Sequence, residues 1–201
     1  MKKEIKRFDL SKKPQKCSPI FRPLRGIYAN GAVKKHEEII TKTNMEGIEP
    51  PFLLLCNHNA LLDIQTAIHV LGKQNSNFVV AIDGAINRGW LFRKIGNIVT
   101  RKFTNDPNLV WHLKHVVNMG CVPVLYPEAR YSLCGTTAVL PESTGILCKF
   151  LKVPVVTLIC HGHHINHPFW NTSHDRGVKH TEIEMKLLFT VDDLTTALRY
   201  H

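Results

Sequence analysis

The segment LLLCNHNALLDI, residues 53–64, joins a short apolar run to Asn57-His58 and then, five residues after the histidine, to Asp63. A short apolar run that ends in polar residues is typical of a buried strand in a parallel sheet. The apolar periodicity resumes after Asp63 and stops at Gly72, which predicts a helix with a C-terminal glycine. We therefore expect a strand, a corner that carries His58 and a helix in direct succession.

The spacing between His58 and Asp63 indicates a bend in the chain. In a continuous helix, five positions would place the two side chains about 140° apart, so they meet only at a corner. An imidazole that is held by a carboxylate on one ring nitrogen presents the other as a proton acceptor, which suits general-base catalysis near neutral pH. A second interpretation is equally simple: His58 ends the strand and Asp63 caps the next helix.

Two later apolar runs form further sequence motifs together with the His58 segment. The segment VPVLYPEARYS, residues 122–132, ends in Glu128 and Arg130, and VPVVTLIC follows at 153–160. In order and separation, the three blocks make residues 45–165 resemble the glycerolipid acyltransferases of the 1-acylglycerol-3-phosphate (lysophosphatidate) type. The resemblance implies a glycerol-phosphate acyltransferase-like fold. It also implies acyl transfer to a lipid hydroxyl, in phospholipid biosynthesis.

The resemblance also implies roles for individual residues. Glu128 would hold the glycerol hydroxyls of the acceptor. The family's second motif, which ends in Asp-Arg, corresponds to GNIVTRK at residues 96–102, where the aspartate is missing and either Arg101 or Lys102 takes the place of the arginine. We favour Arg101 because a planar guanidinium binds phosphate at two points.

The third motif departs from the family pattern, which reads Phe-Pro-Glu-Gly-Thr-Arg-Ser. Tyr126 replaces the phenylalanine and Ala129 the glycine, Arg130 comes one residue early, and Tyr131 stands at the arginine position. The resemblance assigns the phosphate contact to this arginine, so here it implies Arg130 as the candidate.

Apolar runs alternate with amphipathic segments along the rest of the chain. Strands are predicted at 77–82, 96–103, 121–126 and 153–160, and helices at 89–96, 106–120 and 143–151. This alternation predicts an α/β fold, a three-layer domain with a mostly parallel sheet flanked by helices, in which His58 and Glu128 share one crevice at the carboxyl ends of the strands. Residues 34–43 are expected to form a helix, and residues 181–189 a last antiparallel strand at an edge.

Positive charge is concentrated at the N-terminus. Residues 1–36 hold eleven Lys or Arg against two acidic residues, a net charge of +9, while the whole chain carries +10. We expect residues 1–44 to form a basic, partly amphipathic arm and residues 45–201 the acyltransferase domain, shortened at its C-terminus relative to longer family members. Within the arm, Phe21, Leu24, Ile27 and Tyr28 fall at helical spacing beside arginines.

The arm has two interpretations: an interfacial segment on an anionic membrane surface, or a segment packed over the edge of the sheet. Nucleic acid is not the expected partner, because aromatic residues do not alternate with the basic ones and no nucleic-acid-binding motif is present. The apolar runs fall short of the roughly 18 residues of a membrane span, and no secretory signal pattern follows the basic start. Six scattered cysteines indicate reduced thiols. We expect a cytoplasmic protein, peripheral to the inner face of the membrane.

The predicted mechanism is acyl transfer without a covalent enzyme intermediate, with His58 as base and Asp63 as its orienting group. The expected co-substrate is acyl-CoA or acyl-carrier protein, the acceptor is a lysophospholipid, and no metal or other cofactor is expected. Two alternatives stay open. The histidine-rich segment CHGHHINH, residues 160–167, is compatible with a metal-dependent hydrolase using His161 to His167, and the basic arm with a catalytically silent lipid-binding relative.

Overall fold

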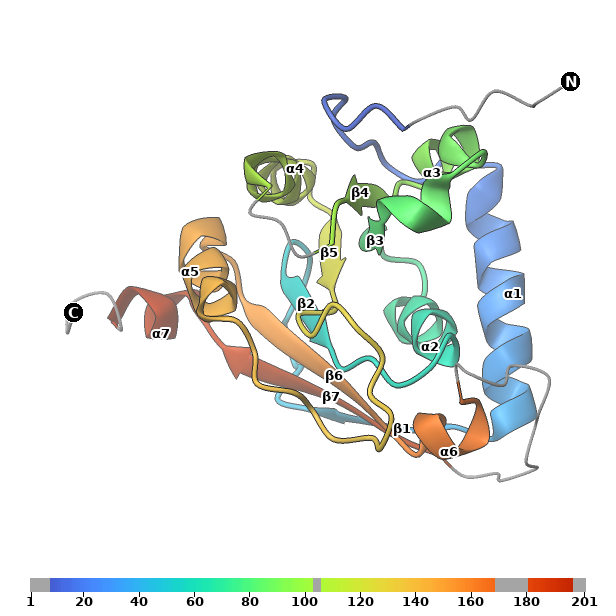
Figure 1. Cartoon of the computed structure of the whole chain (residues 1–201). Helices are drawn as coiled ribbons and strands as arrows, with labels where there is room; N and C mark the ends of the chain where they lie inside the picture. The colour runs from blue at the N-terminus through green and yellow to red at the C-terminus, as the bar shows by residue number, and fades with distance from the viewer. Residues whose placement is uncertain (1–7, 103–105, 169–180, 197–201) are drawn as a thin grey trace, which may run out of the picture.

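The computed structural model describes residues 8–102, 106–168 and 181–196 (Figure 1). These residues form one seven-stranded sheet, with the strands in the order β1-β7-β6-β2-β5-β3-β4. In that order, the strands are β1 (Ile39–Thr43), β7 (Glu182–Phe189), β6 (Val155–His161), β2 (Leu53–Cys56), β5 (Val122–Leu125), β3 (Ser76–Ala81) and β4 (Ile98–Thr100). The five strands from β6 to β4 run parallel, whereas β7 runs antiparallel to β6 and β1 pairs with β7.

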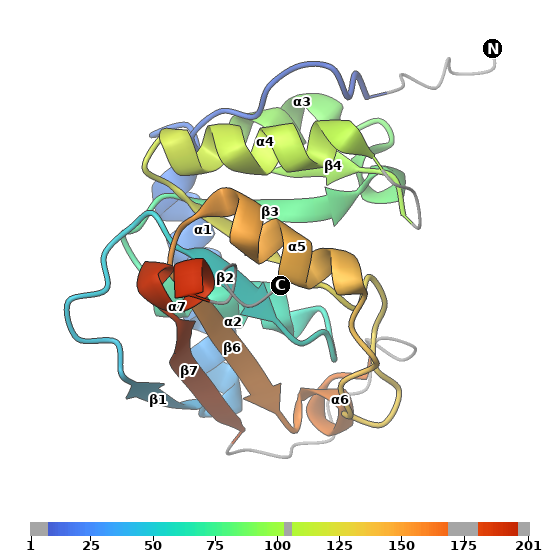
Figure 2. The same ribbon diagram turned by 90° about the vertical axis from the view of Figure 1, so that its left-hand side faces the viewer.

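Helices cover both faces of the sheet (Figures 1 and 2). One face packs against α1 (Phe21–His36) and α2 (Leu62–Leu71), and the other against α4 (Pro107–Asn118), α5 (Glu142–Leu151) and α7 (Val191–Thr196). Three shorter helices complete the described chain: η1 (Ile82–Ala85), α3 (Gly89–Lys94) and α6 (His163–Asn166). The predicted three-layer α/β architecture is therefore confirmed.

The central strand β2 shows why the sheet needs a layer of helices on each face. All four of its residues are buried, with Leu54 and Cys56 in the apolar cluster beneath α1 and α2, and Leu53 and Leu55 in the cluster beneath α4 and α5. Successive side chains of a strand point to opposite faces, so a strand without polar alternation requires apolar neighbours on both sides. No helix among the described residues is both long enough and apolar enough to cross a bilayer.

The segment at 34–43 differs from the helix predicted for it. Helix α1 ends at His36 because Glu37 adopts a left-handed conformation, with φ 48°, and its N–H bonds back to the carbonyl of Lys34. The β-branched residues that follow form β1 instead, which pairs with β7 from the far end of the sequence. Strand β7 is antiparallel as predicted, but it is not an edge strand, because β1 lies outside it.

Helix α1 begins inside the predicted arm and has two different faces. Ala29 belongs to the apolar cluster shared with α2, whereas Ile27 and Tyr28 are about two-thirds exposed, at 70% and 62%. Pro23 is tolerated because it lies in the first turn, where a missing N–H costs no helical hydrogen bond. Residues 21–43 therefore pack with the rest of the domain, while the outer face of α1 remains uncovered.

Candidate active site

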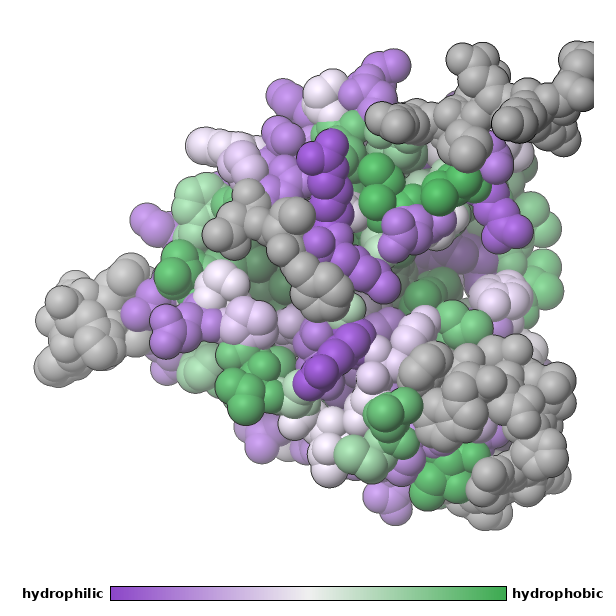
Figure 3. All heavy atoms as spheres, in the orientation of Figure 1, coloured by the Kyte–Doolittle hydropathy of each residue, from purple (hydrophilic) through white to green (hydrophobic). Residues whose placement is uncertain are grey.

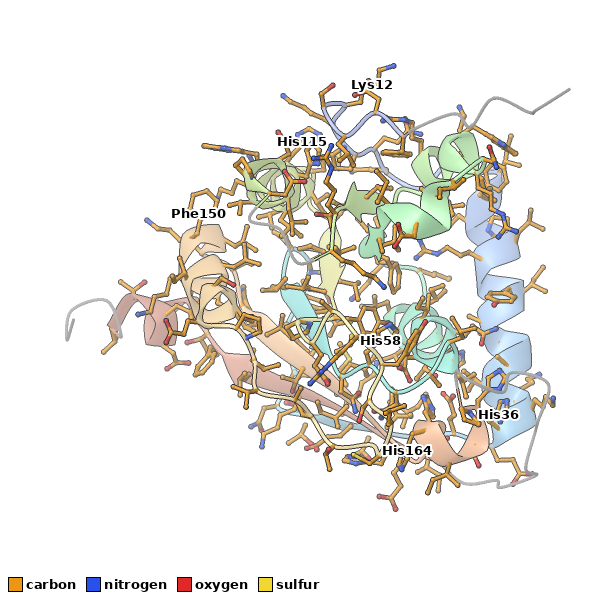
Figure 4. All side chains as sticks on the ribbon, viewed as in Figure 1. Lys12, His36, His58, His115, Phe150 and His164 are labelled. Carbon is orange, nitrogen blue, oxygen red and sulfur yellow. The ribbon has the colours of Figure 1, made fainter. Side chains whose placement is uncertain are left out.

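The corner after β2 is fixed to the neighbouring strand β6. The side-chain amide of Asn57 donates to the carbonyl of Cys160 at 3.0 Å, and the N–H of Cys160 donates to Asn57 Oδ1 at 2.9 Å. Asn59 donates to the same carbonyl at 2.7 Å. These bonds hold both residues that flank His58, so the position of the histidine is set by its neighbours rather than by a flexible loop. Figure 4 shows His58 beside the start of α2, close to the ends of β2 and β5.

His58 and Asp63 meet across this corner. Nδ1 of His58 lies 3.1 Å from Oδ2 of Asp63, which sits in the first turn of α2. The same oxygen accepts hydrogen bonds from the backbone N–H groups of Asn59 and Ala60, at 2.6 and 2.8 Å. Asp63 therefore orients the imidazole and fixes the corner before α2. It does not cap the helix, because the N-cap residue is Leu61, which has no side-chain cap bond, and both N–H groups precede it.

Glu128 follows β5, the strand next to β2, and reaches the same corner. One of its oxygens lies 3.4 Å from the backbone nitrogen of His58, which donates to it, and the other accepts from the N–H of Ala138 at 3.1 Å. The N–H of Ser132 also donates to the carbonyl of His58, at 2.6 Å. The loop after β5 is thus bonded to the backbone of His58 itself.

Two tyrosines pack against the imidazole of His58. The ring centroids of Tyr126 and Tyr131 lie 4.3 and 4.0 Å from that of His58. Burial, together with the charge of Asp63, raises the pKa of Tyr131 to about 12, so its phenol is neutral near pH 7. Tyr131 stands where the resemblance places an arginine, and in this chain that position packs against the histidine instead.

The three predicted cations are exposed. Arg130 is exposed and follows Ala129, whose φ of 54° is left-handed, the conformation for which a glycine at this motif position is suited. Arg101 and Lys102 are exposed at the carboxyl end of β4. Strand β4 lies three strand positions from β2, which corresponds to about 14 Å along the sheet edge. The structure brings His58, Asp63 and Glu128 together, but it places Arg101 and Lys102 well to one side.

The structure also reveals a contact that the sequence did not predict. Nδ1 of His163, at the start of α6, lies 2.7 Å from Oδ1 of Asp63, and its Nε2 lies 3.3 Å from Oε1 of Glu38. The hydroxyl of Thr66 donates to the same Glu38 oxygen at 2.7 Å. Asp63 thus has a histidine on each of its two oxygens. The only sequence signal was the density of histidines at 160–167.

This histidine-rich segment does not converge on one point. His161 is exposed at the end of β6, His163 is buried against Asp63, and His167 stacks on His36 of α1 with ring centroids 5.9 Å apart. Figure 4 shows His36 and His164 on the side of the molecule where α6 meets the end of α1. Of the four histidines in the segment, only His163 joins Asp63.

One cluster has the composition of a metal site. Asp63, Cys160 and His163 are all buried, with one donor atom from each within 4.8 Å of the others. Two of the three are already bonded to each other, since Nδ1 of His163 lies 2.7 Å from Oδ1 of Asp63. We therefore treat the cluster as a hydrogen-bonded group.

The hydrogen bonds of this cluster favour a negative charge on Asp63 and a positive charge on His163. Burial by itself acts to raise the pKa of Asp63, but hydrogen bonds from His163 and His58 outweigh it, and the pKa lies below its ordinary value. Burial likewise acts to lower the pKa of His163, but the bonds to Asp63, Cys160 and Glu38 raise it well above the ordinary value. An ionised Asp63 between two imidazoles is the state that this geometry stabilises.

Comparisons with known proteins address the family and the fold. The family model described as Acyltransferase matches residues 33–161. Among solved structures, the 1-acyl-sn-glycerophosphate (LPA) acyltransferase PlsC from Thermotoga maritima is similar, with a TM-score of 0.60 and 13% sequence identity, over 89% of this chain and 75% of that one. At this identity the likeness shows the fold. None of the curated proteins compared matches the sequence.

Proposed function

Because the chain belongs to the Acyltransferase family, we propose that it transfers a fatty acyl group from an acyl thioester to a lysophospholipid hydroxyl in phospholipid biosynthesis, with 1-acylglycerol 3-phosphate as the acceptor. One observation carries this proposal. Nδ1 of His58 is engaged by Asp63, so Nε2 is the nitrogen left to accept a proton, and Glu128 lies at the same corner. This is a general base with an acceptor-binding carboxylate beside it.

The reaction needs no covalent intermediate on the protein. As the acceptor hydroxyl attacks the thioester carbonyl carbon, its proton moves to Nε2 of His58 and a C–O bond forms. The tetrahedral intermediate then collapses, the C–S bond breaks, and the departing thiolate takes the proton from His58. Asp63 stabilises the imidazolium that exists between these two steps, and the protein otherwise supplies alignment.

Acceptor recognition is assigned to the loop after β5. Glu128 uses one lone pair on each oxygen for backbone N–H groups, which leaves acceptor capacity for a glycerol hydroxyl. Arg130, two residues later and exposed, is the cation proposed to bind the phosphate, with Arg101 and Lys102 as a second cationic group along the same edge.

The acceptor assignment predicts a ranking of substrates. Acyl transfer from labelled acyl-CoA and acyl-carrier protein is measured in anionic vesicles with lysophosphatidate, glycerol 3-phosphate and monoacylglycerol as acceptors. We expect lysophosphatidate to be used best. Arg130→Ala should raise its KM by about 10-fold or more, because charge-assisted hydrogen bonds contribute about 1.5–3 kcal/mol, and should leave monoacylglycerol unaffected.

Lys73→Ala is the matched control, since Lys73 is exposed beyond the opposite end of α2. An equal loss for charged and uncharged acceptors in Arg130→Ala would contradict phosphate binding by this residue. Vesicle binding without turnover on any acceptor would overturn the enzymatic proposal in favour of a lipid-binding protein.

The outer face of α1 is proposed as the membrane contact. Ile20, Leu24, Ile27 and Tyr28 are exposed there beside Arg22, and Trp90 of α3 packs on Phe21 with ring centroids 6.4 Å apart. Figure 3 shows apolar side chains along the edge of the molecule over α1. Apolar side chains beside cations are what binding at an anionic lipid surface requires.

Binding to vesicles tests this face. Leu24→Glu/Ile27→Glu should lower partitioning onto phosphatidylserine-containing vesicles by at least about 10-fold, because burial of each large apolar side chain contributes about 1.5–3 kcal/mol. The control is Trp111→Glu, an equally exposed apolar residue on α4. If both variants lose binding equally in sedimentation, the contact is not specific to α1.

A further inference from the structure

A buried histidine lies between two buried carboxylates behind the proposed catalytic pair. The side chains of Asp63, His163 and Glu38 are all 0% exposed. Nδ1 of His163 is 2.7 Å from Asp63 and its Nε2 is 3.3 Å from Glu38, so each ring nitrogen faces an acid. The three residues come from separate segments: the start of α2, the start of α6 and the residue before β1.

Two carboxylates around one ring favour the doubly protonated form of His163. A neutral imidazole has one N–H and one lone pair, so it would turn a lone pair toward one of the two carboxylates. That contact is repulsive, and neither group can be compensated by solvent at this burial. An imidazolium donates a hydrogen bond to Asp63 from Nδ1 and keeps its positive charge 3.3 Å from the Glu38 oxygen that already accepts from the Thr66 hydroxyl. Among the described residues, the Cys160 thiol also lies beside His163, and burial raises its pKa to about 12, so it contributes no charge near pH 7.

We propose that Glu38 and His163 are positioning residues for the acyl-transfer reaction: His163, as a permanent imidazolium, holds Asp63 in place, and Glu38 supplies the negative charge that His163 would otherwise cancel at His58. This inference rests on the proposed role of His58 as the base. His163 uses Oδ1 of Asp63, which leaves Oδ2 directed at His58 and at the two backbone N–H groups of the corner.

The charges explain why two residues are needed. Asp63 and His163 alone form a neutral pair, which stabilises an imidazolium at His58 poorly. With Glu38 the group carries a net charge of −1, as an isolated Asp63 would. The other groups around His58 are the carboxylate of Glu128, bound to its backbone, and the neutral phenols of Tyr126 and Tyr131. Glu38 is therefore the compensating charge for His163.

The protonation of His163 is measured without reference to activity. Two-bond ¹⁵N–¹H spectra of the ¹⁵N-histidine-labelled full chain report whether each ring nitrogen carries a proton. We expect one ring, absent from the spectrum of His163→Gln, to show two N–H groups from about pH 5 to about pH 9, a range over which an ordinary histidine loses one. A single N–H on this ring at neutral pH would overturn the proposal, whatever the enzyme's substrate is.

Kinetics then test the coupling to His58. Glu38→Gln makes the buried group more positive, so the acid limb of the kcat/KM profile should move to lower pH by about one unit and kcat should fall by about 10-fold. His163→Gln removes the positive charge and should move the limb the other way. The double variant has the parent's net charge, and its limb should return to the parent position.

A purely structural role predicts a different pattern. If the residues only fill space, the double variant would be at least as impaired as the worse single variant, and the acid limb would not move in opposite directions. Either result would overturn the proposal. Glu46→Gln, an exposed acid between β1 and β2, is the charge control and should leave the profile unchanged. Thermal unfolding of each variant confirms that the compared proteins are folded.

Discussion

Substitution of His58 by alanine is expected to lower kcat/KM for acyl transfer by at least about 100-fold, the lower range for loss of a general base. The imidazole is the group positioned to take the acceptor's proton, and no other side chain at the corner replaces it: Tyr126 and Tyr131 are neutral phenols, and Glu128 is bound to backbone N–H groups. Because His58 retains 14% side-chain exposure, its loss should change stability much less than activity.

The measurement is initial-rate acyl transfer with the best acceptor, beside thermal unfolding. His115→Ala is the matched control, because His115 lies on α4, which covers the face of the sheet opposite α2. Full activity in His58→Ala would contradict the proposal that His58 is the general base. If His58→Ala and His115→Ala were impaired alike, the loss would reflect folding rather than catalysis.

Substitution of Asp63 by alanine should affect both activity and stability. Removal of one partner from a buried ion pair costs about 3–5 kcal/mol, because the other partner is left uncompensated. Here the carboxylate also accepts two backbone N–H groups and holds His58. We expect unfolding free energy to fall by about that amount in urea titrations, and acyl transfer to be lost together with the orientation of His58.

The stability difference should depend on pH in a defined direction. The pKa of Asp63 is below its ordinary value of 3.8 in the folded chain, so its stabilising contribution is present above about that pH and is lost as the pH falls through the lowered value. Parent and Asp63→Ala should therefore converge in acid. Asp83→Ala, an exposed acid in η1, should show no such difference. A gap that stays constant down to low pH would contradict the assignment.

The parts of the site that were predicted share a local cause. The meeting of His58 with Asp63 follows from a strand, a corner and a helix within twelve residues, and the approach of Glu128 follows from parallel strands whose carboxyl ends share an edge. The burial of β2 on both faces could also be predicted, because an uninterrupted apolar run requires apolar neighbours on both sides of the sheet.

The parts that were missed depend on distant partners. Nothing in the sequence of residues 39–43 indicates that they pair with β7, which is formed by residues far away in the chain. The helix predicted at residues 34–43 was wrong for that reason. In the segment 160–167, the choice of His163 as the partner of Asp63 follows from the turn at Gly162, with φ 86°, which starts α6 and aims one histidine inward. The contact of Tyr131 with His58 depends on how the loop after β5 folds back.

The contact between Glu38 and His163 also has a consequence for the order in which the site forms during folding. The two residues are separated by 125 positions, and they lie near β1 and β6, between which β7 lies in the sheet. During synthesis, His58, Asp63 and Glu128 all leave the ribosome before His163 does, so a partial chain contains the reactive groups without their support. Because contacts of long sequence separation form slowly, acyl transfer should appear after the bulk of secondary structure in a refolding experiment. The lag would report the formation of the long-range contacts around Asp63, and the last increase in rate would follow the arrival of His163 beside Asp63 and Glu38.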